Sequence, residues 1–199
     1  MQAIHLALFE ALRAEHALTP SLLWLARHGA SLGAVLVAWV ILRHPKARIH
    51  GCVIVLAAVL ASGMAHALAD AIGMARPYMQ GLGAPRIPHG ARGALPSAHA
   101  SVMFTVALLL WRRPELRLTA LAATLLAFLT SWGRIQANLH FPLDIAAGLL
   151  LAAMLASAFH LLVSRLSHLV RQLRAARGQA AGLSPGDAPA AQAGAPSLH

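Results

Sequence analysis

Six polar residues whose types suit phosphate chemistry stand at the ends of apolar segments in this chain. They belong to three short motifs, which are Arg76-Pro77, Pro96-Ser97-Ala98-His99, and Arg134 followed by His140 and Asp144. Arginine and serine can hold phosphate oxygens, a histidine can attack phosphorus or donate a proton, and an aspartate can orient a histidine ring. Ionisable groups at the edge of a bilayer are costly, so their concentration there indicates a functional site.

The composition is that of a membrane protein. The chain has 199 residues, of which 58% are hydrophobic and only 11% charged, and its mean hydropathy is +0.65. The net charge of +10 comes from basic residues that cluster in short connections between apolar runs, so we expect no nucleic-acid partner. A single cysteine, Cys52, excludes an intramolecular disulfide.

Five apolar segments are candidate membrane spans, since a spanning helix needs roughly 20 mostly apolar residues. They are 22–42, 49–74, 97–111, 116–132 and 142–163. The third is short, and Arg112 can extend it by reaching toward the interface. The fold class predicted is therefore all-α, a polytopic membrane helical bundle with about five spanning helices.

Basic residues are distributed unevenly over the connections. Ten of the sixteen follow the first, third and fifth spans, and these are Arg43, Lys46, Arg48, Arg112, Arg113, Arg117, Arg165, Arg171, Arg174 and Arg177. If the spans alternate in direction, these residues share one side, which the positive-inside rule places in the cytoplasm. The three polar motifs then meet at the opposite, outer face.

The two ends of the chain differ from the spans. Apolar residues are interspersed among polar ones over 1–20, which predicts an amphipathic helix at the interface or a cap on the bundle. Residues 171–199 are first basic and then rich in Ala, Gly and Pro, and we expect a disordered tail there. The domain that carries the motifs is thus expected at 21–170.

The third motif has the spacing of a histidine held by an aspartate. Pro142 lies between His140 and Asp144 and marks a helix start. A helix beginning there places Asp144 in its first turn, within reach of the His140 ring. A carboxylate on one ring nitrogen fixes the tautomer and leaves the other nitrogen free to attack. Alternatively, His140 is a structural histidine at the interface whose hydrogen bond is made by Asp144.

The second motif has the features of an anion site at a helix start. Ser97 follows a proline and precedes an apolar run, so it is a natural N-cap. A helix N-terminus offers free N–H groups to an anion, and Arg76 and Arg134 could neutralise charge that develops in a transition state. Alternatively, Ser97 is only a cap and the two arginines are interfacial anchors.

The ordered set of motifs resembles the three signature motifs of the type-2 phosphatidic acid phosphatase superfamily, over about 49–163. The resemblance implies a membrane phosphatase that uses no metal and no cofactor. It implies that His140 is the nucleophile that forms a phosphohistidine, that Asp144 holds its ring, and that His99 is the general acid. It also implies that Arg76, Ser97 and Arg134 form the phosphate cradle.

Within that superfamily, the chain resembles the small bacterial undecaprenyl-diphosphatases of the bacitracin-resistance type. The stretches that carry this resemblance are Arg76-Pro77-Tyr78-Met79, Gly81-Leu82-Gly83 and His140-Phe141-Pro142-Leu143-Asp144. It implies a polyprenyl diphosphate lipid as the substrate, and a site on the periplasmic face of a bacterial inner membrane. The open alternatives are a phosphatase for phosphatidylglycerol phosphate, phosphatidic acid or lipid A, a lipid phosphotransferase, and a non-catalytic membrane binder. Nothing in the sequence indicates an oligomeric state.

The chain departs from the family pattern at one expected cation. The first motif usually begins with a lysine seven residues before its arginine, and this position is Ala69. Arg86, His89 and Arg92 in the following connection could replace that charge, and the sequence does not select among them. A smaller departure is Gly133, where the family often has serine.

Overall fold

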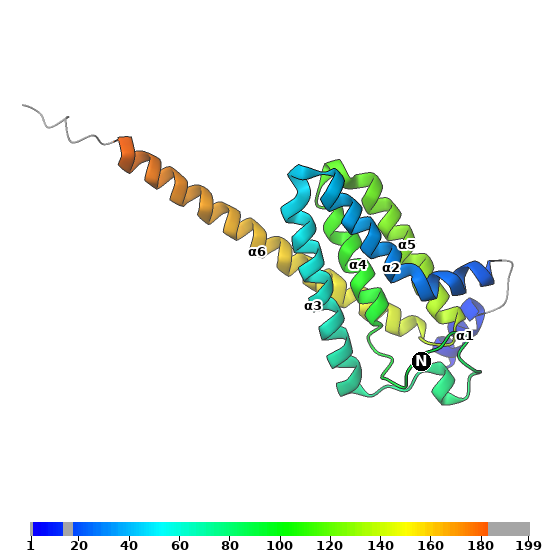
Figure 1. Ribbon diagram of the computed structural model, residues 1–199. Coiled ribbons are helices and arrows are strands. Elements are labelled where there is room, and N and C mark those ends of the chain that lie inside the picture. The colour runs from blue at the N-terminus through cyan, green and yellow to red at the C-terminus, as the bar shows by residue number, and fades with distance from the viewer. Residues whose placement is uncertain (1, 14–17, 183–199) are drawn as a thin grey trace, which may run out of the picture. The chain divides into compact units, whose positions relative to one another are not determined.

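The computed structural model describes residues 2–13 and 18–182, and this part of the chain is helical without a strand (Figure 1). The α-helices are α1 (Gln2–Arg13), α2 (Thr19–Arg43), α3 (Arg48–Ile72), α4 (Ala98–Leu110), α5 (Arg117–Gln136) and α6 (Pro142–Gly182). Three 3-10 turns accompany them: η1 (Pro45–Ala47), η2 (Pro77–Gln80) and η3 (Pro114–Leu116). Residues up to His160 form one unit, and the part of α6 from Leu161 belongs to a second. The all-α prediction is confirmed.

Within residues 2–13 and 18–182, four helical segments are long and apolar enough to cross a membrane, and α4 is a shorter apolar helix. The four are Thr19–Arg43, Pro45–Gln80, Pro114–Gln136 and Pro142–Arg177. Their outer surfaces carry large apolar side chains that are more than 60% exposed, among them Val35, Leu42, Ile49, Leu118 and Leu150. Such a surface is stable in hydrocarbon and not in water, so the protein is a multi-pass membrane helical bundle.

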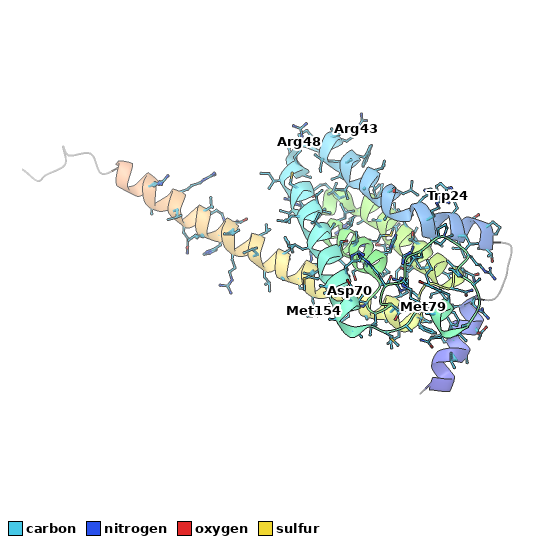
Figure 2. The ribbon with its side chains drawn as sticks, turned by 60° about the horizontal axis from the view of Figure 1, so that its bottom comes forward. Trp24, Arg43, Arg48, Asp70, Met79 and Met154 are labelled. Carbon is cyan, nitrogen blue, oxygen red and sulfur yellow. The ribbon has the colours of Figure 1, made fainter. Side chains whose placement is uncertain are left out.

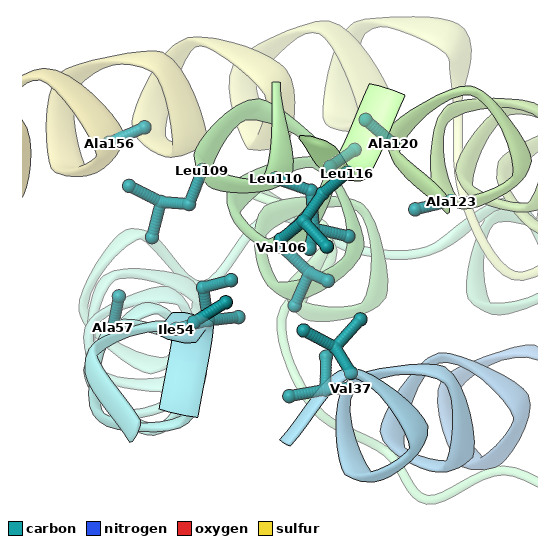
Figure 3. Packing of buried hydrophobic residues seen from close by; sticks show 13 residues of the cluster. Val37, Ile54, Ala57, Val106, Leu109, Leu110, Leu116, Ala120, Ala123 and Ala156 are labelled. Atoms are coloured by element: carbon teal, nitrogen blue, oxygen red, sulfur yellow. The ribbon is translucent and has the colours of Figure 1, made fainter. Parts of the chain in front are cut away.

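Small residues line the contacts between the helices. Buried alanines follow one another at four-residue intervals along α3, at Ala57, Ala61, Ala65 and Ala69. Larger side chains fill the space where α2, α3, α4 and η3 meet, and Figure 3 shows Val37, Ile54, Val106, Leu109, Leu110 and Leu116 pointing toward one another. Lipid tails are as apolar as leucine, so close packing between small residues is what holds such helices together.

Two glycines bring α2 and α5 into close contact. A Cβ on Gly29 of α2 would overlap the side chain of Thr130 on α5, and a Cβ on Gly133 of α5 would overlap the Leu22 carbonyl on α2. Gly133, one of the departures from the family pattern, is therefore required by this helix contact. The same contact fixes the position of Arg134, which follows Gly133 directly.

The connections of the bundle lie at two ends. The α2–α3 and α4–α5 turns lie together at one end, and the connection from α3 to α4 lies at the other (Figure 1). Arg43 and Arg48 mark the first end, away from Asp70 and Met79 (Figure 2). The alternating spans expected from the sequence therefore bring 76–96 and 134–141 to the same end.

The helix α1 caps this second end. Phe9 is fully buried, and its ring centroid lies 5.1 Å from that of Phe141. The Trp132 indole N–H donates to the Leu12 carbonyl at 3.0 Å. For residues 1–20 the sequence left open an amphipathic helix at the interface or a cap on the bundle. These contacts are those of a cap, while Leu6 and Leu8 of α1 remain exposed.

The helix α6 is longer than the span 142–163 expected from the sequence. It continues to Gly182, so 171–182 of the expected disordered tail is helical. Leu166, Leu169 and Leu173 recur at helical spacing, and no glycine or proline interrupts the chain between Pro142 and Gly178 except Gly148. The rest of the expected tail, 183–199, lies outside the described residues.

Replacing Gly133 with alanine should destabilise the bundle by about 1–3 kcal/mol, because the new methyl group would overlap the Leu22 carbonyl. Thermal unfolding of the detergent-solubilised protein measures this as a lower midpoint. Gly63→Ala is the matched control, since a Cβ there meets nothing within 4 Å. Equal midpoints for the two variants would contradict this account of the α2–α5 contact.

Candidate active site

A cavity of about 690 Å³ opens among α2, α3, α4 and α5, and its polar end holds four of the six expected site residues. These four are Arg76, His99, Arg134 and His140. His66, Asp70, His89 and Arg92 also line the cavity, while the rest of its wall is mostly apolar. The structure therefore joins the three motifs around one space that has a charged end and an apolar extension.

His140 lies between Asp144 and Arg76 in the connection that precedes α6. Its ring is buried, with Nδ1 3.4 Å from Asp144 Oδ2 and Nε2 3.1 Å from Arg76 Nη1. A guanidinium only donates hydrogen bonds, so Nε2 must accept one. The ring proton is therefore on Nδ1, facing the carboxylate, and the lone pair is on Nε2.

Asp144 holds both the His140 ring and the start of α6. Its Oδ2 accepts a hydrogen bond from the Phe141 backbone N–H at 2.8 Å, and the side chain is fully buried. Pro142 is the first residue of the helix, so this bond is the N3-to-N-cap half of a capping box. The local structure that begins α6 thus also places a carboxylate against the imidazole.

Arg76 joins two separate connections at the site. Its Nε donates to the Arg92 carbonyl at 2.8 Å and its Nη2 to the Gly93 carbonyl at 3.0 Å. Its Nη1 donates to the Leu139 carbonyl at 3.1 Å, in addition to His140. Most of the donors expected to hold phosphate are thus occupied by protein groups, and Arg76 positions the nucleophile candidate and the 90–93 loop.

Arg134 has more capacity for a ligand than Arg76. It is 3% exposed, and its Nη1 donates to the Ala26 carbonyl on α2 at 3.3 Å. Its Nε is buried and has no hydrogen-bond partner among the described residues. The residue also lines the cavity, so its guanidinium charge would stabilise an anion there.

Ser97 and His99 occupy different places at the start of α4. Ser97 is the N-cap, and its side chain accepts from the Ala100 N–H at 3.5 Å. Its own N–H donates to the Asp144 carbonyl at 3.0 Å, and it lies behind the cavity wall rather than on it. His99, in the first turn, does line the cavity.

A close helix contact holds α6 against the start of α4. A Cβ on Gly148 of α6 would come within 2.9 Å of the Ser97 carbonyl and the Ala100 Cβ. The absence of a side chain at Gly148 therefore permits this approach. The same contact, together with the bond from Ser97 to Asp144, sets the second and third motifs side by side.

The electrostatics of the site favour an anion next to a neutral histidine. Burial, followed by the charges of Arg134 and Arg76, lowers the pKa of His140 well below its usual value of 6.5. At neutral pH the ring is therefore uncharged and Nε2 keeps its lone pair. The same charges would attract an anion to the cavity, chiefly at Arg134, since most Arg76 donors are bonded to protein carbonyls.

Residues outside the three motifs also line the cavity. Three residues were candidates to replace the lysine charge that is missing at Ala69. Of these, His89 and Arg92 line the cavity and Arg86 does not. The connection that carries them is anchored by a hydrogen bond from the Tyr78 hydroxyl to the Gly90 carbonyl at 3.1 Å. This contact and those of Arg76 join residues distant in sequence, so no local pattern signals them.

Two solved structures share the fold. The Aquifex aeolicus protein LpxE is 24% identical, and the match covers 77% of this chain and 93% of LpxE with a TM-score of 0.64. A transmembrane PAP2-type phosphatidylglycerolphosphate phosphatase from Bacillus subtilis is 18% identical, and that match covers 82% and 86% of the two chains with a TM-score of 0.62.

Similarity to a curated relative is local. The Escherichia coli (strain K12) protein named "Putative undecaprenyl-diphosphatase YbjG" is 35% identical over 77 residues, which are 38% of this chain and 37% of the relative. The model of the PAP2 superfamily matches residues 50–167, more than half of the chain, and this segment contains all six motif residues. The chain belongs to the PAP2 superfamily, a family of lipid phosphatases.

Proposed function

We propose that this protein hydrolyses undecaprenyl diphosphate to undecaprenyl phosphate and inorganic phosphate through a phosphohistidine. The observation that carries the proposal is the oriented, neutral His140, whose Nε2 is directed away from Asp144 at the charged end of a partly apolar cavity. Membership of the PAP2 superfamily supports a lipid phosphatase. The diphosphatase name of the Escherichia coli relative supports a diphosphate substrate.

In the first step, His140 would attack the terminal phosphorus of the bound lipid. The Nε2–P bond forms as the bond between phosphorus and the bridging oxygen breaks, and Arg76 Nη1 moves from Nε2 to a phosphate oxygen. The imidazolium that results keeps its proton on Nδ1, where the Asp144 carboxylate stabilises it. Arg134, which lines the cavity, would stabilise charge on the phosphoryl oxygens.

His99 would move the protons of both steps. It lies in the first turn of α4 and lines the cavity, so it can protonate the oxygen of the departing undecaprenyl phosphate. The neutral ring can then accept a proton from the water that attacks the phosphohistidine, which releases inorganic phosphate and restores His140. These steps require no metal ion or cofactor.

The apolar part of the cavity supports a lipid chain as the remainder of the substrate. Its wall includes small residues of α2 and α3, which leave room beside the charged end; these are Ala30, Gly33, Ala34, Ala38, Ala58, Ser62 and Ala65. A Cβ on Gly33 meets nothing within 4 Å, so the space extends to that helix backbone. One long polyprenyl chain would bury its surface there.

We further propose that the protein lies in a bacterial inner membrane with the site on the periplasmic side. Arg43 and Arg48 lie at the end of the bundle away from the site, where the positive-inside rule places the cytoplasm (Figure 2). An outward-facing site suits a lipid carrier whose diphosphate is released on the outer leaflet.

The purified protein in detergent should release phosphate from undecaprenyl diphosphate faster than from phosphatidylglycerol phosphate, phosphatidic acid or lipid A. A chelator should not change the rate, and His140→Ala should reduce it by at least 100-fold, because the nucleophile is lost. A preference for phosphatidylglycerol phosphate would replace the diphosphatase proposal with the activity named for the Bacillus subtilis neighbour. A fully active His140→Ala variant would refute the phosphohistidine mechanism.

The neutral state of His140 also predicts a pH dependence of stability. The pKa of His140 is lowered in the folded state. As the pH falls below 6.5, His140 is therefore protonated in the unfolded chain but stays neutral in the folded protein. Stability should therefore fall from pH 6.5 downward, by about 1.4 kcal/mol at pH 5.5 from this group alone. Thermal unfolding midpoints of the wild type and of His140→Gln, measured between pH 7.5 and 5.5, should diverge, with the wild type losing more. Parallel curves would show that the folded His140 accepts the proton.

A further inference from the structure

The loop that covers the end of α3 occupies the region next to the departure at Ala69. The Ala69 carbonyl lies so close to Gly93 that a Cβ on this glycine would overlap it. The Ala94 N–H donates to the Met74 carbonyl at 2.8 Å, which holds the same loop against the chain that follows α3. A connection packed in this way brings its own side chains to the cavity wall that Ala69 also lines.

Two hydrogen bonds anchor the backbone that follows His89 at the charged end of the cavity. Next to it, the Gly90 carbonyl accepts from the Tyr78 hydroxyl at 3.1 Å. Three residues on, the Arg92 carbonyl accepts from Arg76 Nε at 2.8 Å. The His89 side chain is open to solvent and lines the cavity together with Arg76 and His140, so a ligand can reach it.

The surroundings of His89 are strongly positive. Burial against the site, followed by the charges of Arg134 and Arg76, lowers its pKa to about 3. The titratable or charged groups that share the cavity with it come from three helices and two connections. They are Arg134 of α5, His66 and Asp70 of α3, His99 of α4, Arg76 and Arg92 of its own connection, and His140 of the connection before α6. The ring is therefore neutral while the cavity holds no anion. A dianionic phosphate bound among these groups places negative charge beside the ring and favours uptake of a proton by the ring.

We propose that His89 is a phosphate ligand that supplies, in protonated form, the positive charge missing at Ala69. This inference rests on the proposed function, since it concerns the phosphate of the same reaction. His89 takes up a proton when the substrate binds and donates a charge-assisted hydrogen bond to a non-bridging oxygen of the transferring phosphoryl group. It thereby acts with Arg134, while Arg76 remains largely engaged with backbone carbonyls.

The test compares His89→Ala and His89→Lys with Arg92→Ala and with Arg86→Ala, a control in the same connection whose side chain does not line the cavity. His89→Ala should reduce kcat/KM for undecaprenyl diphosphate by roughly 10-fold or more, since a hydrogen bond to a charged group is worth at least one decade. His89→Lys should recover most of the loss, and Arg86→Ala should leave the activity unchanged. A loss confined to Arg92→Ala would assign the charge to Arg92 and overturn the proposal.

The pH profile separates a protonated ligand from a structural role. The ratio of kcat/KM for the wild type to that for His89→Lys should rise as the pH falls from 8 to 6, because the histidine must gain a proton that the lysine already carries. The ionisation of the substrate is common to both proteins and cancels in the ratio. A flat ratio would overturn the claim that His89 binds as a cation.

Binding of inorganic phosphate keeps this inference distinct from the proposed reaction. Phosphate should raise the thermal unfolding midpoint of the wild type and raise that of His89→Ala much less, with Arg86→Ala matching the wild type. If the wild type hydrolyses no lipid but this difference persists, the proposed function fails and His89 remains a phosphate ligand. If the wild type is active, His140→Ala is inactive and His89→Ala matches the wild type in rate and phosphate response, only the His89 proposal fails.

Discussion

The rest of the site depends on the hydrogen bonds that the buried guanidinium of Arg76 donates. It donates to carbonyls of Arg92, Gly93 and Leu139 and to Nε2 of His140, and so joins the α3–α4 connection to the α5–α6 connection. A buried cation is tolerated only when its donors are satisfied, so these stretches must meet at one point. The same geometry orients the His140 ring, because its Nε2 accepts from Arg76 Nη1 at 3.1 Å.

Close helix packing in an apolar bundle makes this meeting point possible. Gly133 allows α5 to approach the backbone of α2, and Gly148 allows α6 to approach the start of α4. The first contact places Arg134, and the second places Asp144 next to Ser97. Small residues thus set the positions of the site residues by letting the helices approach. In lipid, van der Waals packing rather than hydrophobic burial holds helices together.

The arrangement concentrates positive charge around a neutral imidazole. Within the described part of the chain, Arg134 Nε is buried without a hydrogen-bond partner, while Arg76 donates to protein carbonyls. Burial and these two charges lower the pKa of His140. In the proposed function, these charges would stabilise a phosphate bound in the cavity. In the proposed mechanism, phosphate binding and the neutral state of His140 would have the same physical origin, since the arginines that would attract the anion also keep His140 unprotonated.

The sequence by itself determined the spans, the start of α6 at Pro142 and the pairing of His140 with Asp144, because apolar runs, proline at N1 and short spacings are local signals. Its motifs also named four residues that line the cavity. Only the tertiary structure decided that Ser97 lies behind the wall, that Arg76 is occupied by carbonyls, and that His89 lies at the site. These facts depend on contacts between residues far apart in the chain. Such contacts are set by how closely helices pack, and a pattern of neighbouring residues does not encode them.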